Sequence, residues 1–337
     1  MEPNHKIHAE TLDNMAKLWR EKLNGRQMVS KRYDVGNSGE NHVASRTTEQ
    51  LHPQAIGFDA LPLEQAAVIL AEGQADAART PRTAAGAIST GAQAMANTIR
   101  TGGVLRYAAA GSSGLMAAAD ALELGGTYSI PPTQIRIHMA GGQPTGVEMP
   151  GDTEDDAASL AREMNDIASH DTLIAVSASG STPFTIAAAK IAREAGAQVI
   201  GIANNLDTEL SELSHHSVVL ETPPEVIAGS TRMGAGTAQK IALNMLSTLM
   251  AVQLGHVHDG MMVNLKADNI KLRQRANAIV AHAAGATEDQ AASALESAGG
   301  DVKTAILLAA GAENASQARS LLAESDGHLR PALSELT

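Results

Sequence analysis

Hydroxyl side chains gather in a short stretch that follows the apolar run 172–176. They are those of Ser177, Ser179, Ser181 and Thr182. Pro183 comes next, and because proline suits the first position of a helix, the stretch predicts a strand that turns directly into a helix. The hydroxyls and the unpaired N–H groups of that helix start form an anion site. A phosphoryl group, with three acceptor oxygens, suits this site better than a carboxylate.

The same pattern occurs earlier in the chain. The predicted strand 104–110 is followed by Gly111-Ser112-Ser113-Gly114 and then by a predicted helix at 115–124. Both turns then lie at the carboxyl edge of one parallel sheet, where open α/β sheets bind ligands. Serines that merely cap a helix would explain a single turn of this kind, but two turns favour a phosphate-binding site.

A third loop rich in hydroxyls lies between the last predicted strand and a strongly apolar helix that ends near Leu254. The loop begins at Glu225, contains Ser230 and Thr231, and extends to Lys240. We expect these four residues to contribute to substrate binding.

Two glutamates could act on a ligand held in this way. Glu123 lies in the predicted helix after the first serine turn, on a face shared with Met116 and Ala119. We therefore expect it to be half-buried, which would raise its pKa and suit it to general acid catalysis. Glu154 lies at the start of a predicted helix at 155–168, where the positive helix end would keep it ionised as a base. From the residues alone, an ordinary surface glutamate and a charged helix start stay open as alternatives.

Several other kinds of site are disfavoured by what the sequence lacks. It has no cysteine, no Gly-Lys-Ser/Thr phosphate loop and no complete Gly-x-Gly-x-x-Gly pattern, which argues against thiolate, nucleotide and dinucleotide chemistry. The spacing of His256-Val257-His258-Asp259 can hold a metal, but no further ligands are evident. We therefore expect this stretch, like His215-His216, to be a solvated loop and predict no metal site.

Composition narrows the class of protein further. The 337 residues carry a net charge of −12, which argues against general affinity for nucleic acid. No apolar run is long enough for a membrane span, and the N-terminus lacks the apolar core of a signal peptide. We expect a soluble cytoplasmic protein without a nucleic-acid or membrane partner. With 44% hydrophobic but only 2% aromatic residues, its core must consist of Ala, Leu, Ile, Val and Met.

Strands that alternate with helices predict an α/β protein, in which a parallel sheet lies between two helical layers. The remaining predicted strands are 134–140, 199–203 and 217–220. The remaining predicted helices are 8–23, 63–78, 83–100, 185–195, 209–213, 264–284, 287–298, 301–310 and 316–324. We predict three parts: an N-terminal helix and polar arm at 1–47, a sheet domain with leading helices at 48–262, and a small helical domain at 263–337.

Ten motifs, taken together and in order, resemble the N-acetylmuramic acid 6-phosphate etherase family. The similarity runs from about Thr48 to Leu333. The motifs are Ala110-Gly-Ser-Ser-Gly114, Asp120-Ala-Leu-Glu123, Ala140-Gly-Gly142, Glu154-Asp155, Ser179-Gly-Ser-Thr-Pro183, Pro224-Glu-Val226, Gly229-Ser-Thr-Arg-Met233, Ala235-Gly-Thr-Ala-Gln-Lys240, Leu243-Asn-Met-Leu-Ser-Thr248 and Ala267-Asp-Asn-Ile-Lys-Leu272.

The resemblance implies a sugar-isomerase (SIS) fold with a UBA-like helical domain at the C-terminus, and a homodimer that needs no cofactor. It also implies cleavage of the lactyl ether of a phosphorylated amino sugar during cell-wall recycling, giving N-acetylglucosamine 6-phosphate and D-lactate. The resemblance places the proton donor of the family on Glu123 and its second catalytic carboxylate on Glu154. Glu154 as base and Glu123 as acid is our assignment.

Three motifs depart from the family pattern. Ser181 replaces the arginine of Ser-Gly-Arg-Thr-Pro, Gly234 replaces a lysine, and Leu124-Gly-Gly126 replaces Cys-Pro-Pro before Thr127. Two cations that could contact the phosphate or the lactyl carboxylate are therefore missing. This loss keeps a second function open, namely a phosphosugar-sensing regulator similar to the glucokinase regulatory protein. A third alternative is an aldose–ketose isomerase, which needs a base but no acid for a leaving group.

The distance between the two ends of one helix adds an expectation about assembly. Glu123 follows Ser112 by 11 residues, which is about 16 Å along a straight helix. The reacting carbons of a sugar lie closer than this to its phosphate. We therefore expect Glu123 to reach a phosphate held by a partner subunit, so that each active site is shared across a two-fold dimer.

Overall fold

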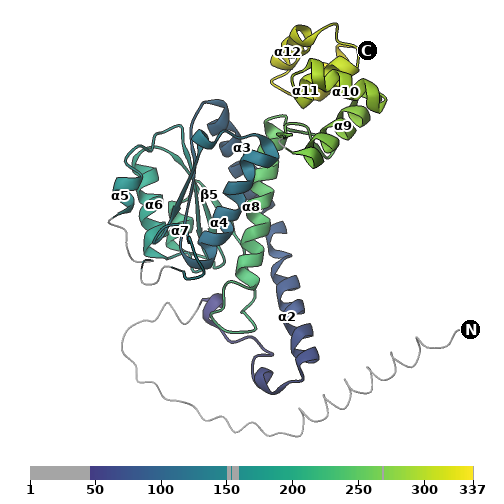
Figure 1. The fold of residues 1–337 in the computed structure, drawn as a ribbon. Helices are drawn as coiled ribbons and strands as arrows, with labels where there is room; N and C mark the ends of the chain where they lie inside the picture. The colour runs from purple at the N-terminus through teal and green to yellow at the C-terminus, as the bar shows by residue number, and fades with distance from the viewer. Residues whose placement is uncertain (1–45, 150–152, 154–158, 268, 337) are drawn as a thin grey trace, which may run out of the picture. The chain divides into compact units, whose positions relative to one another are not determined.

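A computed structural model of the protein describes residues 46–149, 153, 159–267 and 269–336. It confirms the α/β class, because a parallel five-stranded sheet lies between two layers of helices (Figure 1). Each strand lies within two residues of its predicted bounds. The strands are β1 (Leu105–Ala109), β2 (Ile135–Met139), β3 (Thr172–Ser177), β4 (Gln198–Ala203) and β5 (His216–Val219).

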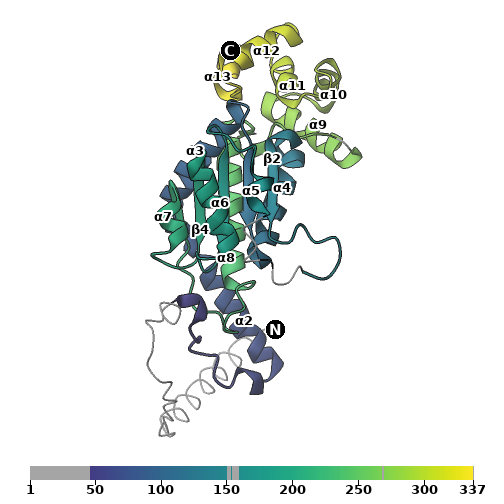
Figure 2. The ribbon, with the colours of Figure 1, turned by 90° about the vertical axis from the view of Figure 1, so that its left-hand side faces the viewer.

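Alternating strand residues pack into two separate cores, one on each face of the sheet. One core, which includes Leu105 and Tyr107, joins the sheet to α3 (Ala85–Arg100), α4 (Gly111–Tyr128) and α8 (Gly234–Gln253). The other core, which includes Leu173 and Ala175, joins it to α5 (Leu160–Glu163), α6 (Pro183–Glu194) and α7 (Glu209–Leu213). Figure 2 turns the α6 and α7 layer toward the viewer. No helix in the described part of the chain could span a membrane.

The described segment before α3 consists of short 3-10 turns and one long helix. These elements are η2 (Thr47–Glu49), η3 (Phe58–Ala60), α2 (Leu63–Ala77) and η4 (Thr80–Arg82), and η5 (Pro132–Gln134) follows later, before β2. Helix α2 packs on α8. The predicted helix at 8–23 lies outside the described residues.

The C-terminal helices enclose a hydrophobic cluster of their own that begins at Val263. The helices are α9 (Ile270–Ala284), α10 (Glu288–Ser297), α11 (Val302–Ala309), α12 (Ala315–Glu324) and α13 (Leu329–Ser334). The capping box of Thr287 and Gln290 at the start of α10 is confirmed. The division of the chain into three parts stays a prediction.

The first of these helices starts later than predicted. We expected a helix from Asn264, but α9 begins at Ile270, where the side chain of Asn269 accepts a hydrogen bond from the N–H of Leu272. Asn264 instead donates its amide to the carbonyl oxygen of Tyr128 at 3.1 Å and accepts from the hydroxyl of Ser129 at 2.5 Å. These bonds to the end of α4 hold residue 264 outside the helix.

Two further expectations are wrong. The predicted helix at 155–168 covers only Leu160–Glu163 among the described residues, and turns follow it. The stretch His256–His258 is not a solvated loop: both histidines are partly buried, and His256 directly precedes a small antiparallel hairpin of β6 (Val257–His258) and β7 (Met261–Met262). The same expectation is wrong for His216, which begins β5. Burial, together with the nearby charge of Lys303, lowers the pKa of His256 to about 4.

A buried ion pair ties the first strand to the loop before β3. The side chains of Arg106 and Asp171 are each 2% exposed, and the Nε of Arg106 donates to Oδ2 of Asp171 at 2.9 Å. Asp171 also accepts from the N–H groups of Val104 and Ala168. Asp166 binds the other side of the guanidinium at 2.9 Å, but its side chain is 60% exposed.

Asp171→Ala should destabilise the fold by about 3–5 kcal/mol, because it leaves the guanidinium of Arg106 buried without its main partner. Asp166→Ala is the matched control and should cost less than about 1 kcal/mol, since this partner is exposed to water. The free energy of unfolding in urea measures both. Equal effects of the two substitutions would contradict this account.

Candidate active site

The strand order places the two predicted serine turns side by side. The sheet runs β2-β1-β3-β4-β5, so the connection after β1 leads to β2 on one side, the connection after β3 leads to β4 on the other side, and the order reverses between β1 and β3. Ala109 at the end of β1 pairs with Val176 near the end of β3. Ligands of open α/β sheets bind at such a reversal, outside the carboxyl ends of the strands. The turns after β1 and β3 therefore flank the expected binding position.

The hydroxyls of the turn after β3 point toward one another. Oγ of Ser177 lies 2.8 Å from Oγ1 of Thr182 and 3.3 Å from Oγ of Ser179, and Ser181 donates to Ser179 at 3.2 Å. Gly180 makes this turn possible because its φ is +69° and a Cβ there would lie 2.5 Å from the side chain of Thr208.

The start of α6 presents N–H groups beside these hydroxyls. Thr182 is the N-cap residue, but its side chain does not cap the helix, and Pro183 occupies the first turn. Because α6 is 12 residues long, its positive end adds to the attraction for an anion. The turn therefore has the donors that a phosphoryl group requires.

The turn after β1 enters α4 without any intervening loop. Gly111 begins the helix with a φ of +53°, and Ser112 and Ser113 lie in its first turn. Ser113 is buried, whereas Ser112 is partly exposed. A Cβ on Gly114 would lie 3.0 Å from the side chain of Met139, so glycine permits the close approach of α4 to β2.

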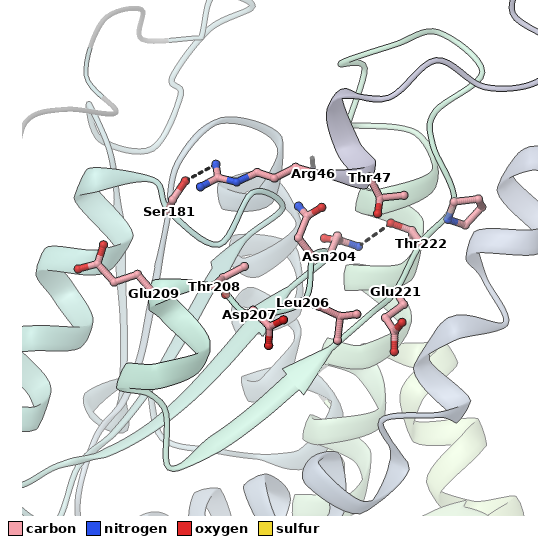
Figure 3. A pocket seen from close by; sticks show the side chains of 12 residues that line it. Arg46, Thr47, Ser181, Asn204, Leu206, Asp207, Thr208, Glu209, Glu221 and Thr222 are labelled. Carbon is pink, nitrogen blue, oxygen red and sulfur yellow. Dashed lines mark hydrogen bonds between the residues drawn. The ribbon is translucent and has the colours of Figure 1, made fainter. Parts of the chain in front are cut away.

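A cavity of about 820 Å³ lies at the carboxyl ends of β3, β4 and β5, next to the serine turn (Figure 3). Ser181 forms one side of it, and the ends of β4 and β5 form much of the rest. The lining residues are Arg46, Thr47, Ser181, Asn204, Asn205, Leu206, Asp207, Thr208, Glu209, Glu221, Thr222 and Pro223.

The third predicted loop connects β5 to α8 at the same edge of the sheet. Glu225 is buried, and its carboxylate accepts hydrogen bonds from the N–H groups of Gly234 and Ala235 at 2.9 and 2.8 Å, so it caps α8. Ser230 and Thr231 are partly exposed in the loop, and Lys240 is exposed on α8. Direct contact of these four residues with a substrate stays a prediction.

The loss of the family lysine at 234 has a local structural counterpart. A Cβ on Gly234 would lie 3.0 Å from Oε2 of Glu225 and 3.1 Å from Cβ of Ala77 in α2. Glycine at this position therefore allows α2 and the side chain of Glu225 to lie close to the start of α8.

Glu123 is exposed, not half-buried as we expected. It lies on the side of α4 that carries Leu122, which is 67% exposed, and no other described part of this chain covers that side. Glu123 lines a small cavity of about 190 Å³ between α4 and α8. Glu154 lies outside the described residues.

A buried carboxylate one helical turn before Glu123 shapes this small cavity. Asp120 accepts hydrogen bonds from Asn244 and Ser247, both at 2.9 Å, and from the hydroxyl of Tyr107 at 3.1 Å. Burial raises the pKa of Asp120, and these hydrogen bonds oppose the rise. The bonds fix the rotation of α4 against α8, and so fix the direction in which Glu123 points.

Within one chain, the serine turn after β1 and Glu123 lie toward opposite ends of α4. Helix α4 is continuous over 18 residues from Gly111 to Tyr128, so Ser112 and Glu123 are about 16 Å apart along its axis. Ser181 and Glu123 line different cavities. The described chain thus brings the hydroxyl turns together but does not bring Glu123 to them.

Comparison with known proteins identifies the family. A domain family described as the SIS domain matches residues 70–204. The N-acetylmuramic acid 6-phosphate etherase of Deinococcus radiodurans is 40% identical over 292 residues, which cover 86% of this chain and 96% of that protein. The chain belongs to the N-acetylmuramic acid 6-phosphate etherase family. The etherase of the same name from Streptomyces avermitilis is 39% identical over 85% of this chain and 93% of that protein. The one from Rubrobacter xylanophilus is 35% identical over 88% of this chain and 98% of that protein.

Some residues that line the large cavity were not found from sequence. Asn204 and Asn205 follow β4 and line the large cavity. A polar pair directly after a predicted strand is the signal that could have indicated them. Arg46 lines the same cavity, but it belongs to an arm for which no family motif gave guidance.

Proposed function

We propose that this protein cleaves the lactyl ether bond of N-acetylmuramic acid 6-phosphate in the cytoplasm, giving N-acetylglucosamine 6-phosphate and D-lactate. The observation that carries the proposal is the 40% identity to the Deinococcus radiodurans etherase over 96% of that protein. The two serine turns at the reversal of the strand order support a phosphorylated substrate.

The reaction needs one base and one acid. In the open-chain sugar, the C1 aldehyde acidifies the proton on C2, and Glu154 removes that proton as base. The bond from C3 to the ether oxygen then breaks, Glu123 gives its proton to the departing oxygen, and D-lactate leaves. Water adds to the resulting C2–C3 double bond, with its hydroxyl on C3 and a proton returned to C2. No cofactor takes part in this scheme.

We further propose a homodimer in which each active site uses residues of both chains. The length of α4 supports this, because a phosphate at Ser112 is too far from Glu123 of the same chain. The exposure of Leu115 and Leu122 on α4 and of Leu249 and Val252 on α8 also supports it. A second copy that covers these apolar side chains would also cover Glu123, and burial raises the pKa of a carboxyl toward the range that suits a general acid.

Incubation with N-acetylmuramic acid 6-phosphate, followed by an enzymatic assay for D-lactate, tests the proposed function. We expect stoichiometric D-lactate and N-acetylglucosamine 6-phosphate, with far slower release from N-acetylmuramic acid, which lacks the phosphate. No lactate, combined with a rise in melting temperature on addition of phosphosugars, would contradict the proposal. That result would favour the alternative of a phosphosugar-sensing regulator. The absence of the family cations at positions 181 and 234 keeps this alternative open.

A further inference from the structure

The segment around Thr48, which precedes the sheet in sequence, is held at the end of β4 by hydrogen bonds. Thr48 is 2% exposed, and its N–H donates to Oδ1 of Asn205 at 3.5 Å while Nδ2 of Asn205 donates back to Oγ1 of Thr48 at 3.2 Å. Nδ2 of Asn205 also donates to the carbonyl oxygen of Ala178 at 2.9 Å, within the serine turn. This buried asparagine therefore holds the segment around Thr48 against the predicted phosphate site.

Arg46 extends from this anchored segment to the serine turn. Its Nη1 donates to Oγ of Ser181 at 2.7 Å, across 135 residues of sequence (Figure 3). No carboxylate of the described residues forms an ion pair with it. A guanidinium has five N–H donors, and a single neutral hydroxyl uses only one of them.

Arg46 differs in charge from the other ionisable residues that line the large cavity. Among the described residues that line the cavity it is the one cation, whereas Asp207, Glu209 and Glu221 are acidic. Glu209 pairs with Lys190 at 2.8 Å, outside the set of lining residues. Arg46 therefore supplies the positive charge on the side of the cavity where the hydroxyls converge.

We infer that Arg46 replaces the arginine that the family carries at position 181, and that its guanidinium binds the phosphoryl group of the substrate. The arginine comes from the N-terminal segment instead of from the turn, and Ser181 orients it. The inference rests on the proposed function for the identity of the phosphosugar. It assigns a binding residue that has no counterpart in the family motifs.

The phosphoryl group is favoured over the lactyl carboxylate as the partner of Arg46. Ser181, which orients the guanidinium, also donates to Ser179, and Ser179 in turn lies beside Ser177 at the end of β3. The cation and the hydroxyls thus belong to one hydrogen-bonded group. An anion with three acceptor oxygens can bind the hydroxyls, the helix start and the guanidinium together, as a carboxylate with two oxygens cannot.

Calorimetric binding of N-acetylglucosamine 6-phosphate, which has the phosphoryl group but no lactyl group, tests the inference. Arg46→Gln should raise Kd by about 10- to 100-fold, the effect of losing a charge-assisted hydrogen bond. The double substitution Arg46→Gln/Ser181→Arg should bring Kd back to within about threefold of wild type, since it restores a guanidinium at the family position. Arg193 is an exposed arginine at the other end of α6. Arg193→Gln is therefore the control and should leave Kd unchanged.

The possible results distinguish a failure of this inference from a failure of the proposed function. The inference is overturned if Arg46→Gln binds the phosphosugar as wild type does, or if the double substitution fails to recover binding. It is also overturned if Arg46→Gln weakens binding of N-acetylmuramic acid instead, because the lactyl carboxylate would then be the partner. If Kd changes as expected but wild type releases no lactate, the inference stands and the proposed function fails.

Discussion

Glu123→Gln should lower kcat for lactate release by about 10²- to 10⁴-fold, the usual effect of removing a general acid or base. Glutamine keeps the shape of the side chain but cannot give a proton to the departing ether oxygen. Because the side chain keeps its size and Glu123 is not among the residues proposed to bind the phosphoryl group, the substitution should leave the melting temperature and the Kd for N-acetylglucosamine 6-phosphate close to the wild-type values.

Steady-state kinetics of Glu123→Gln and of a matched control check this prediction. Glu296 is an exposed glutamate on α10, within the C-terminal helices, and Glu296→Gln should retain wild-type kcat. A loss of less than about threefold in Glu123→Gln would remove Glu123 from the reaction. A large fall in melting temperature would instead assign it a structural role.

The second large effect is complementation between two inactive chains. Glu123→Gln lacks the acid, and Ser179→Ala/Thr182→Ala lacks part of the phosphate turn, so each homodimer should be nearly inactive. If each site takes Glu123 from one chain and the phosphate turn from the other, a heterodimer has one intact site. A fully exchanged equimolar mixture should then regain about a quarter of wild-type activity, since half of the dimers carry one of two sites.

Differently tagged chains allow the heterodimer to be purified and its activity measured directly. The expected value for the pure heterodimer is about half of the wild-type activity per dimer. If the site were built within one chain, both sites of the heterodimer would carry a defect, and its activity would stay at the level of the two parent homodimers. That result would contradict the shared site.

The sequence predicts the sheet better than its surroundings. Buried parallel strands are continuous apolar runs that end at Gly or Ser turns, and β3 and β4 lie where such runs occur. The hairpin of β6 and β7 was missed because strands of two residues leave no periodic signal. Helix α9 starts late because Asn264 is held by bonds to residues about 135 positions earlier in the chain, which no local pattern reports.

The same reasoning explains what was and was not predicted at the site. The serine turns were predictable because strand, glycine and helix start are all local features. The half-burial of Glu123 was a wrong expectation, because apolar neighbours on α4 indicated burial although no other described part of the chain covers that side of the helix. Arg46 could not be predicted, since its contact with Ser181 joins residues 135 positions apart in the sequence.

The central claim is that the ether is cleaved on the sugar side, between C3 and oxygen, by elimination and then addition of water. Reaction in ¹⁸O-labelled water with mass spectrometry of both products tests it most directly. The account predicts one ¹⁸O on C3 of N-acetylglucosamine 6-phosphate and none introduced into the hydroxyl of D-lactate. Label in the lactate hydroxyl, with an unlabelled sugar C3, would contradict it.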